Sequence, residues 1–285
     1  MAQVARGLKR LFLQALPVGT RRRVLQAHPN LRKAAPSGLK LQFDEYLDEF
    51  SVNIDTRFKV ERIMWTGRYE PDLLALLERW VRAECVCFDI GANVGALTLA
   101  MAQRVRGGTG QVHAFEPAPG NFTRLLKNIA LNPSVRSQIH PVNLGVGAER
   151  GTLFWQEEKG NEGNGGLLGT SGVSVSVTTL DQYCQEHDIA RLDFLKIDVE
   201  SMEYEVLCGA AGTLRRCRPR LYFETMGRSA GLRDPDIFRR LEQAGESRGP
   251  DLVPGCGSAS SEQGYPLRGY WRRLEFGYAD RKSVV

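Results

Sequence analysis

One segment restricts the possible folds of this chain more than any other. A short apolar run at 86–90 leads directly into Gly91-Ala-Asn93-Val-Gly95, and a helical pattern follows at 96–104. A glycine-rich loop between a strand and a helix is the context in which α/β proteins bind nucleotides. Glycine permits the tight turn and the close approach of a ligand, and the start of the helix offers unpaired backbone N–H groups. We therefore expect a ligand at this loop.

The pattern around this loop continues along the chain. Helices are predicted at 71–81, 96–104, 121–131, 180–187 and 202–214, and strands at 50–54, 86–90, 111–115, 139–144, 173–178, 194–199 and 220–223. A Gly/Asn/Ser-rich stretch at 160–172 predicts a loop, and Thr179 with Gln182 has the spacing of a capping box. Strands that alternate with helices predict a doubly wound, mostly parallel sheet, which is a Rossmann-like α/β fold.

Composition divides the chain into four parts. We expect a basic arm at 1–40, a lead-in at 41–82 with a strand and a helix, a core at 83–245, and an irregular tail at 246–285 with at most one edge strand. The arm holds nine Lys or Arg residues and no Asp or Glu, whereas the whole chain has a net charge of +5. Such an arm suits peripheral contact with an anionic membrane, and a solvated leader is the alternative. Few aromatic residues accompany the arginines, which disfavours nucleic acid as a partner.

Cysteine usage indicates the cellular compartment in which the protein works. The six cysteines form no C-x-x-C pair and have no companion histidine cluster, which argues against a zinc site. Free thiols fit a reducing cytoplasm, and we expect a cytoplasmic protein, with an organelle transit peptide as the second reading of the arm. Cys85 and Cys87 alternate along a predicted strand and are expected to be small buried hydrophobic residues. His113 and His140 also lie on predicted strands and are expected to be structural.

A carboxylate stands where a nucleoside ribose would be expected. The predicted strand 111–115 ends at Glu116, and in a doubly wound sheet an acid at the end of the second strand reaches the ribose diol. A surface glutamate that caps the helix near Asn121 is the alternative interpretation. The loop lacks the G-x-G-x-x-G fingerprint, since Asn93 replaces a glycine. S-adenosylmethionine has no pyrophosphate and is therefore favoured over NAD as the cofactor.

A second group of charges follows the predicted strand 194–199. Lys196, Asp198 and Glu200 share one side of that strand, and Glu224 ends the next one. Because ligands bind at the carboxyl ends of such strands, Asp198 is our candidate general base, with Lys196 and Glu200 as supporting charges. A salt-bridge network around Lys196 is one alternative. A divalent metal held by Asp198 and Glu224 is possible but not expected.

In combination and order, these pieces resemble the FkbM family of methyltransferases over residues 67–224. The matching segments are Gly67-Arg-Tyr-Glu-Pro71, Phe88-Asp-Ile-Gly-Ala-Asn-Val-Gly95, Ala114-Phe-Glu-Pro117, Thr179-Leu-Asp181, Asp193-Phe-Leu-Lys-Ile-Asp-Val-Glu200 and Leu221-Tyr-Phe-Glu224. The resemblance implies a class I methyltransferase fold and O-methylation of a hydroxyl. Three features depart from the family pattern: Ser201 where glycine is usual, Ala96 where an aromatic residue is frequent, and the tail after residue 245.

We therefore expect an S-adenosylmethionine-dependent methyltransferase that acts on a hydroxyl of a sugar, glycan or natural product. The expected cofactor residues are Asp89, Gly91, Asn93, Gly95, Glu116 and Asn143. Asp89 either accepts a hydrogen bond from the ligand or fixes the loop. A methyltransferase-like binding protein without turnover and an NAD-dependent oxidoreductase are the two alternatives.

Overall fold

The computed structural model describes residues 38–47, 49–67, 69–158, 161–169, 171–199 and 202–223, and isolated positions before residue 38. The predictions for the basic arm and the C-terminal tail therefore lie almost wholly outside the described residues. The strands of the described part are β1 (Lys40–Tyr46), β2 (Phe50–Asp55), β3 (Val86–Ile90), β4 (Gln111–Phe115), β5 (Ile139–Val142), β6 (Gly145–Val146), β7 (Gly151–Glu158), β8 (Asn161–Gly169), β9 (Val173–Thr178), β10 (Phe194–Ile197) and β11 (Arg220–Phe223). The helices are α3 (Lys59–Trp65), α4 (Pro71–Trp80), α5 (Ala96–Val105), α6 (Pro119–Ala130), α7 (Leu180–Glu186), α8 (Glu203–Gly209) and α9 (Ala211–Cys217), with a 3₁₀ turn, η2, at Arg136–Gln138.

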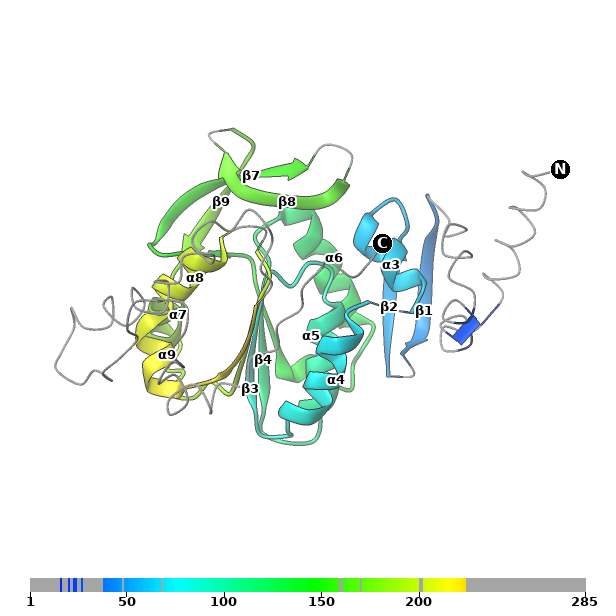
Figure 1. The fold of residues 1–285 in the computed structure, drawn as a ribbon, viewed down its shortest axis with the longest axis horizontal. Helices are drawn as coiled ribbons and strands as arrows, with labels where there is room; N and C mark the ends of the chain where they lie inside the picture. The colour runs from blue at the N-terminus through cyan, green and yellow to red at the C-terminus, as the bar shows by residue number, and fades with distance from the viewer. Residues whose placement is uncertain are drawn as a thin grey trace, which may run out of the picture.

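A five-stranded parallel sheet forms the centre of the fold, in the order β11-β10-β3-β4-β5. Helices α4, α5 and α6 cover one face, and α7, α8 and α9 cover the other (Figure 1). This is the doubly wound α/β fold that the sequence predicts. The chain reverses its direction of winding between β3 and β10, so the carboxyl end of β3 lies at the switch point where such sheets bind ligands.

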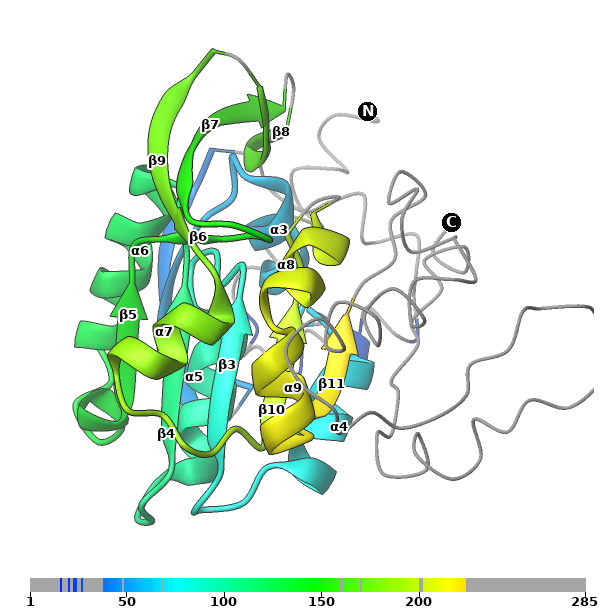
Figure 2. The same cartoon turned by 90° about the vertical axis from the view of Figure 1, so that its left-hand side faces the viewer.

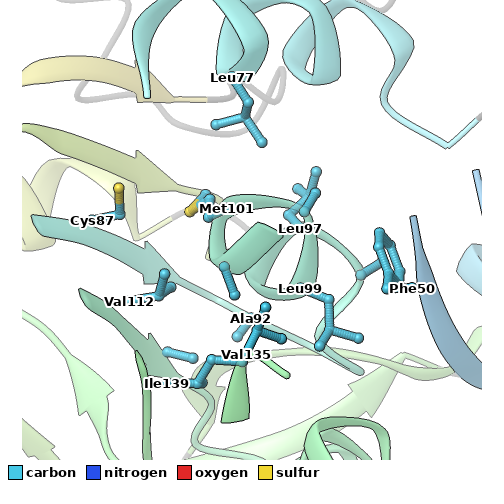
Figure 3. Close-up of a cluster of buried hydrophobic side chains, with 14 of the residues drawn as sticks. Phe50, Leu77, Cys87, Ala92, Leu97, Leu99, Met101, Val112, Val135 and Ile139 are labelled. Carbon is cyan, nitrogen blue, oxygen red and sulfur yellow. The ribbon is translucent and has the colours of Figure 1, made fainter. Parts of the chain in front are cut away.

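Each face of this sheet has its own hydrophobic cluster. On the first face, Cys87, Val112 and Ile139 from the strands pack against Leu97 and Met101 of α5 (Figure 3). Phe50 of β2 and Leu77 of α4 join the same cluster, so the lead-in shares its core with the parallel sheet. The second face packs α7 and α8 against the strands through the buried side chains Phe88, Phe115, Leu180, Leu195, Val206 and Leu207. Full burial of one such apolar side chain contributes roughly 1.5–3 kcal/mol.

Two asparagines, Asn128 in α6 and Asn132 just after it, attach the β1–β2 hairpin to the core. The side-chain oxygen of Asn132 accepts from the Ser51 N–H at 2.8 Å, and its amide donates to the Ser51 carbonyl at 2.7 Å. Asn128 accepts from the Asn53 N–H at 2.8 Å and donates to the Val94 carbonyl at 2.8 Å. These amides satisfy backbone groups at the edge of β2 much as another strand would. Strand β1 and helix α3 themselves are not among the sequence predictions.

A second, smaller sheet in the order β6-β9-β7-β8 stands above the carboxyl ends of the parallel strands (Figure 2). The prediction of a loop at 160–172 is wrong, because β8 occupies Asn161–Gly169 and pairs antiparallel with β7. Composition suggested a loop, but backbone pairing with β7 needs no side-chain propensity. The predicted strands 139–144 and 194–199 are also too long, since β5 ends at Val142 and β10 at Ile197.

The predicted helix 202–214 is two helices that meet at Ala210. The carboxylate of Asp181 accepts from the N–H groups of Gly212 at 2.8 Å and Thr213 at 2.6 Å, which satisfies the first turn of α9 from another element. The prediction of one helix is wrong because the periodicity of apolar residues does not indicate a capping side chain that comes from a distant part of the sequence. Within α7, the side chain of Thr179 accepts from the Gln182 N–H at 3.1 Å, which confirms the predicted N-cap.

A stack of imidazoles lies between β4, β5 and α7. The rings of His113 and His140 stack with centroids 4.6 Å apart, and Nδ1 of His113 pairs with the Tyr183 hydroxyl at 2.9 Å. Burial, together with the nearby His140 and His187, lowers the pKa of His113 to about 3. The folded protein therefore keeps His113 neutral, which fits the predicted structural role.

We predict that the stability of this protein falls with acid partly through His113. Below pH 6.5 the unfolded chain binds a proton at this residue and the folded chain does not, so the free energy of unfolding drops by about 2 kcal/mol between neutral pH and about pH 5. Urea unfolding at both pH values should show a smaller drop for His113→Asn. The matched control is Gln185→Asn, at an exposed position of α7 that does not titrate, which should retain the wild-type drop. Equal drops in wild type and His113→Asn would contradict the assignment.

Candidate functional site

The glycine loop is held directly against the carboxyl end of β4. The N–H groups of Gly91 and Ala92 both donate to the Phe115 carbonyl, at 3.0 and 2.9 Å. Gly91 has φ +79°, and a Cβ there would lie 1.9 Å from the Asp198 carbonyl oxygen, so only glycine fits this position. Gly95, with φ +89°, is the N-cap of α5, and a Cβ there would lie 2.5 Å from Leu125 Cδ1. The loop, β4 and the chain after β10 therefore converge at one edge of the sheet.

Asn93 and Glu116 face each other across this edge. Asn93 adopts a left-handed conformation with φ 51°, and its N–H donates to Oε2 of Glu116 at 2.7 Å. Oε1 of Glu116 accepts from the Ala118 N–H at 3.0 Å. Burial raises the pKa of Glu116 to about 7, against the opposing effect of these two N–H donors and of Lys196. Asn143 donates to the carbonyls of Glu116 and Pro117 at 2.8 and 3.2 Å, so it supports the turn after β4.

Asp89 and Lys196 form a buried ion pair between β3 and β10. Their side chains are 0% and 2% exposed, and Lys196 Nζ lies 3.0 Å from Oδ1 of Asp89. The Thr98 hydroxyl donates to Oδ2 of Asp89 at 2.6 Å, and Lys196 Nζ also donates to the Gly91 carbonyl at 2.7 Å. Asp89 thus fixes the loop, which is one of the two roles considered for it. The alternative of a salt-bridge network around Lys196 is present in the structure.

Asp198 is the most exposed of the described carboxylates among the predicted site residues, which also include Asp89 and Glu116. Its side chain is 24% exposed, and Oδ2 lies 3.8 Å from Lys196 Nζ. Burial alone lowers the pKa of Lys196, but the carboxylates of Asp89 and Asp198 outweigh it and raise that pKa. Lys196 therefore stays protonated, and it can act as a fixed positive charge but not as a base.

The segment before α4 also contributes to the site, although no residue of it was predicted as a site residue. Tyr69 is partly exposed, yet burial and then the carboxylate of Asp198 raise its pKa well above 10.0. Glu70 adopts a left-handed conformation with φ 45°, and its charge also acts on Lys196. A strained non-glycine residue next to a charge cluster is frequent at functional sites. The sequence signal for this contribution is Gly67-Arg-Tyr-Glu-Pro71, which is part of the resemblance to the family but does not by itself predict a role in the site.

Three residues that the sequence analysis singles out lie outside the described residues: the carboxylates Glu200 and Glu224, and Ser201, which departs from the family pattern. The possible metal site formed by Asp198 and Glu224 is therefore not tested by the structure, because Glu224 is not described. Among the residues that the structure describes, no group of three or more His, Cys, Asp or Glu side chains has the arrangement of a metal site. Within the same part of the chain, no helix is long and apolar enough to cross a membrane.

Comparison with known proteins identifies the family. The family model described as "Methyltransferase FkbM domain" matches residues 89–247, which is more than half of the chain. The chain belongs to the FkbM family of methyltransferases. The match begins at Asp89 and includes the glycine loop, Glu116 and Asp198, so the site assembled above lies within the family domain.

Relatives of this FkbM methyltransferase come from several organisms. Hexuronic acid methyltransferase AglP of Haloferax volcanii is 25% identical over 179 residues, which cover 62% of this chain and 70% of that protein. Methyltransferase sdnD of Sordaria araneosa is 28% identical over 154 residues, which cover 42% of this chain and 58% of that protein. A crystal structure of methyltransferase FkbM from Methylobacillus flagellatus matches 65% of this chain and 48% of its own, with 16% identity and a TM-score of 0.43.

We predict that Lys196→Met destabilises the protein by about 3–5 kcal/mol, because it leaves the carboxylate of Asp89 buried without its counter-ion. Urea unfolding of wild type and variant measures this loss. The double variant Asp89→Asn/Lys196→Met should recover part of the stability, since it removes both charges. Lys127→Met on the exposed side of α6 is the control and should change stability by less than about 0.5 kcal/mol. A Lys196→Met variant as stable as this control would contradict the role given to the ion pair.

Proposed function

We propose that this FkbM methyltransferase uses S-adenosylmethionine to methylate a hydroxyl of a small acceptor such as a sugar, a glycan or a natural product. The observation that carries the proposal is the convergence of the glycine loop, Glu116 and Asp198 at the carboxyl ends of β3, β4 and β10. In a doubly wound sheet this edge is where nucleoside ligands bind. The hexuronic acid methyltransferase named among the relatives is consistent with a sugar as the acceptor.

The residues of the loop fit a nucleoside without a pyrophosphate. Gly91 and Gly95 allow the loop its positive φ angles and its close packing on Asp198 and Leu125, and the first turn of α5 offers its N–H groups. Glu116 would accept hydrogen bonds from a ribose diol through the lone pairs that remain on its two oxygens. Asn143 and Asp89 would act indirectly, by holding the β4 turn and the loop.

Asp198 is the residue that we propose to remove the proton from the acceptor. Bound S-adenosylmethionine would supply a methyl group that is already activated by its sulfonium, so the protein needs mainly to orient the acceptor and accept a proton. The carboxylate of Asp198 is partly exposed, and its backbone touches the loop at Gly91. Lys196, which stays protonated, places a positive charge 3.8 Å from this carboxylate, and the carboxylate would accept the proton as the general base.

The cofactor assignment predicts a pH-dependent affinity for S-adenosylmethionine. Because the pKa of Glu116 is about 7, its carboxylate is protonated below neutral pH and loses acceptor capacity for the ribose. Titration calorimetry should show binding about tenfold weaker near pH 6 than near pH 8, and this difference should vanish in Glu116→Gln. Glu116→Ala should weaken binding by at least about tenfold at pH 8.

The control for this measurement is Glu149→Ala, which removes an exposed carboxylate outside the loop and should bind as wild type does. Absence of binding by a folded wild-type protein would overturn the cofactor assignment. Binding that is equally tight in wild type and Glu116→Ala would retain the cofactor and reject the ribose contact.

The assignment of the base predicts a separation of binding from turnover. Asp198→Asn keeps a similar side chain but cannot accept the proton, so methyl transfer to a hydroxylated acceptor should fall by about 10²–10⁴-fold. The affinity for S-adenosylmethionine measured by calorimetry should stay within about threefold of wild type, a change of less than about 1 kcal/mol. Asp188→Asn, at an exposed turn after α7, is the control and should retain full turnover. Undiminished transfer by Asp198→Asn would exclude this residue as the base.

A further inference from the structure

The small sheet has an apolar strip on one of its faces. In the antiparallel pair β7–β9, Leu153 lies opposite Val175, Trp155 opposite Val173, and Gly151 opposite Val177. Residues directly opposite each other point to the same face, so these side chains form one continuous row. We call Leu153, Trp155, Val173, Val175 and Val177 the apolar strip. The opposite face has Ser174 and Ser176 at the intervening positions, together with Phe154.

One end of the apolar strip packs on the chain that follows the candidate base. Val175 and Val177 cluster with Met202, and Val199 packs against the same cluster. Val199 is the residue directly after Asp198, so this end of the strip adjoins the candidate site. Gly209 of α8 packs closely on the carbonyl of Gly147, just after β6, and a Cβ on Gly209 would lie 2.0 Å from that oxygen. This contact holds α8 against the end of the small sheet where β6 pairs with β9.

The other end of the strip is open to solvent. Val177 and Val175 are only 3% and 6% exposed, whereas Val173 is 50% exposed, and Trp155 is partly exposed. Burial thus decreases steadily with distance from Val199. The sheet stands over the carboxyl ends of the parallel strands, where the ligands of this fold bind (Figures 1 and 2). Strand β8, at the edge of this sheet, reaches α3, close in sequence to Tyr69.

We propose that the apolar strip binds the nonpolar body of the acceptor, while the acceptor hydroxyl lies at Asp198. This inference rests on the proposed function and narrows its substrate class to hydroxylated molecules that carry a hydrocarbon or aromatic portion beside the hydroxyl. A partly exposed row of one tryptophan and several aliphatic side chains that adjoins a polar site has the composition of a small-molecule site. A bare sugar would leave most of this row unused.

Two probes with the same sugar and different apolar portions test the proposal. Octyl β-glucoside, below its micelle concentration, and methyl β-glucoside are titrated into the full chain loaded with S-adenosylhomocysteine and followed by NMR. Wild type should bind the octyl compound at least about tenfold more tightly than the methyl compound, because the octyl chain buries apolar surface. Trp155→Ala and Val173→Asp should each reduce this preference by at least about fivefold.

The matched control is Phe154→Ala, which removes an aromatic ring from the neighbouring position but the opposite face of β7. It should leave the preference for the octyl compound unchanged. Equal binding of the two probes by wild type, or an equal effect of Phe154→Ala and Trp155→Ala, would overturn the proposal. Calorimetry with S-adenosylmethionine on every variant reports folding and cofactor binding separately, so a failure of the proposed function would appear there and not in the comparison of probes.

Discussion

The buried ion pair between Lys196 and Asp89 determines the arrangement of the whole candidate site. The two residues lie opposite each other in the parallel pairing of β10 and β3. From this position the lysine also donates to the Gly91 carbonyl and lies near Asp198. Its ammonium group therefore joins the central strand, the glycine loop and the candidate base. Removing two charges from water is costly, and in the interior such a pair is retained only where its hydrogen bonds and geometry are good.

The candidate site contains two kinds of residue: buried residues that hold its strands and loop in place, and partly exposed residues that can touch a ligand. Asp89 and Lys196 are almost completely buried, and Thr98 completes their hydrogen bonding. Asp198 and Tyr69 are partly exposed and lie within each other's electrostatic influence. The sequence predicts Asp89 at the glycine loop, Asp198 as the general base and Lys196 as a supporting charge, but it does not indicate how exposed each side chain is. Asp89 and Lys196 are buried and organise the site, whereas Asp198 is partly exposed and can touch a ligand.

The sequence predicted the parallel sheet and most of its helices correctly because their signals are local. An apolar run of five residues before a glycine loop, or a leucine stripe after Pro71, does not depend on the remainder of the chain. The errors arose where distant segments decide the outcome. Strand β8 has a loop-like composition and is stabilised by pairing with β7, and α9 begins where Asp181 caps it. Likewise, no local pattern indicates that Asn128 and Asn132 bind the edge of β2, since one looks like an ordinary polar residue of a helix and the other like an ordinary residue of the turn that follows.

Asn128 has a consequence for how the chain can be divided. Its one amide group connects the hairpin edge at Asn53, the helix α6 and the loop carbonyl of Val94. Phe50 and Leu77 of the lead-in complete the same hydrophobic cluster as α5. A fragment that started at β3 would expose this cluster and leave the amide without its hairpin partner. In physical terms the folded unit therefore includes the lead-in, and the hairpin helps to support the glycine loop.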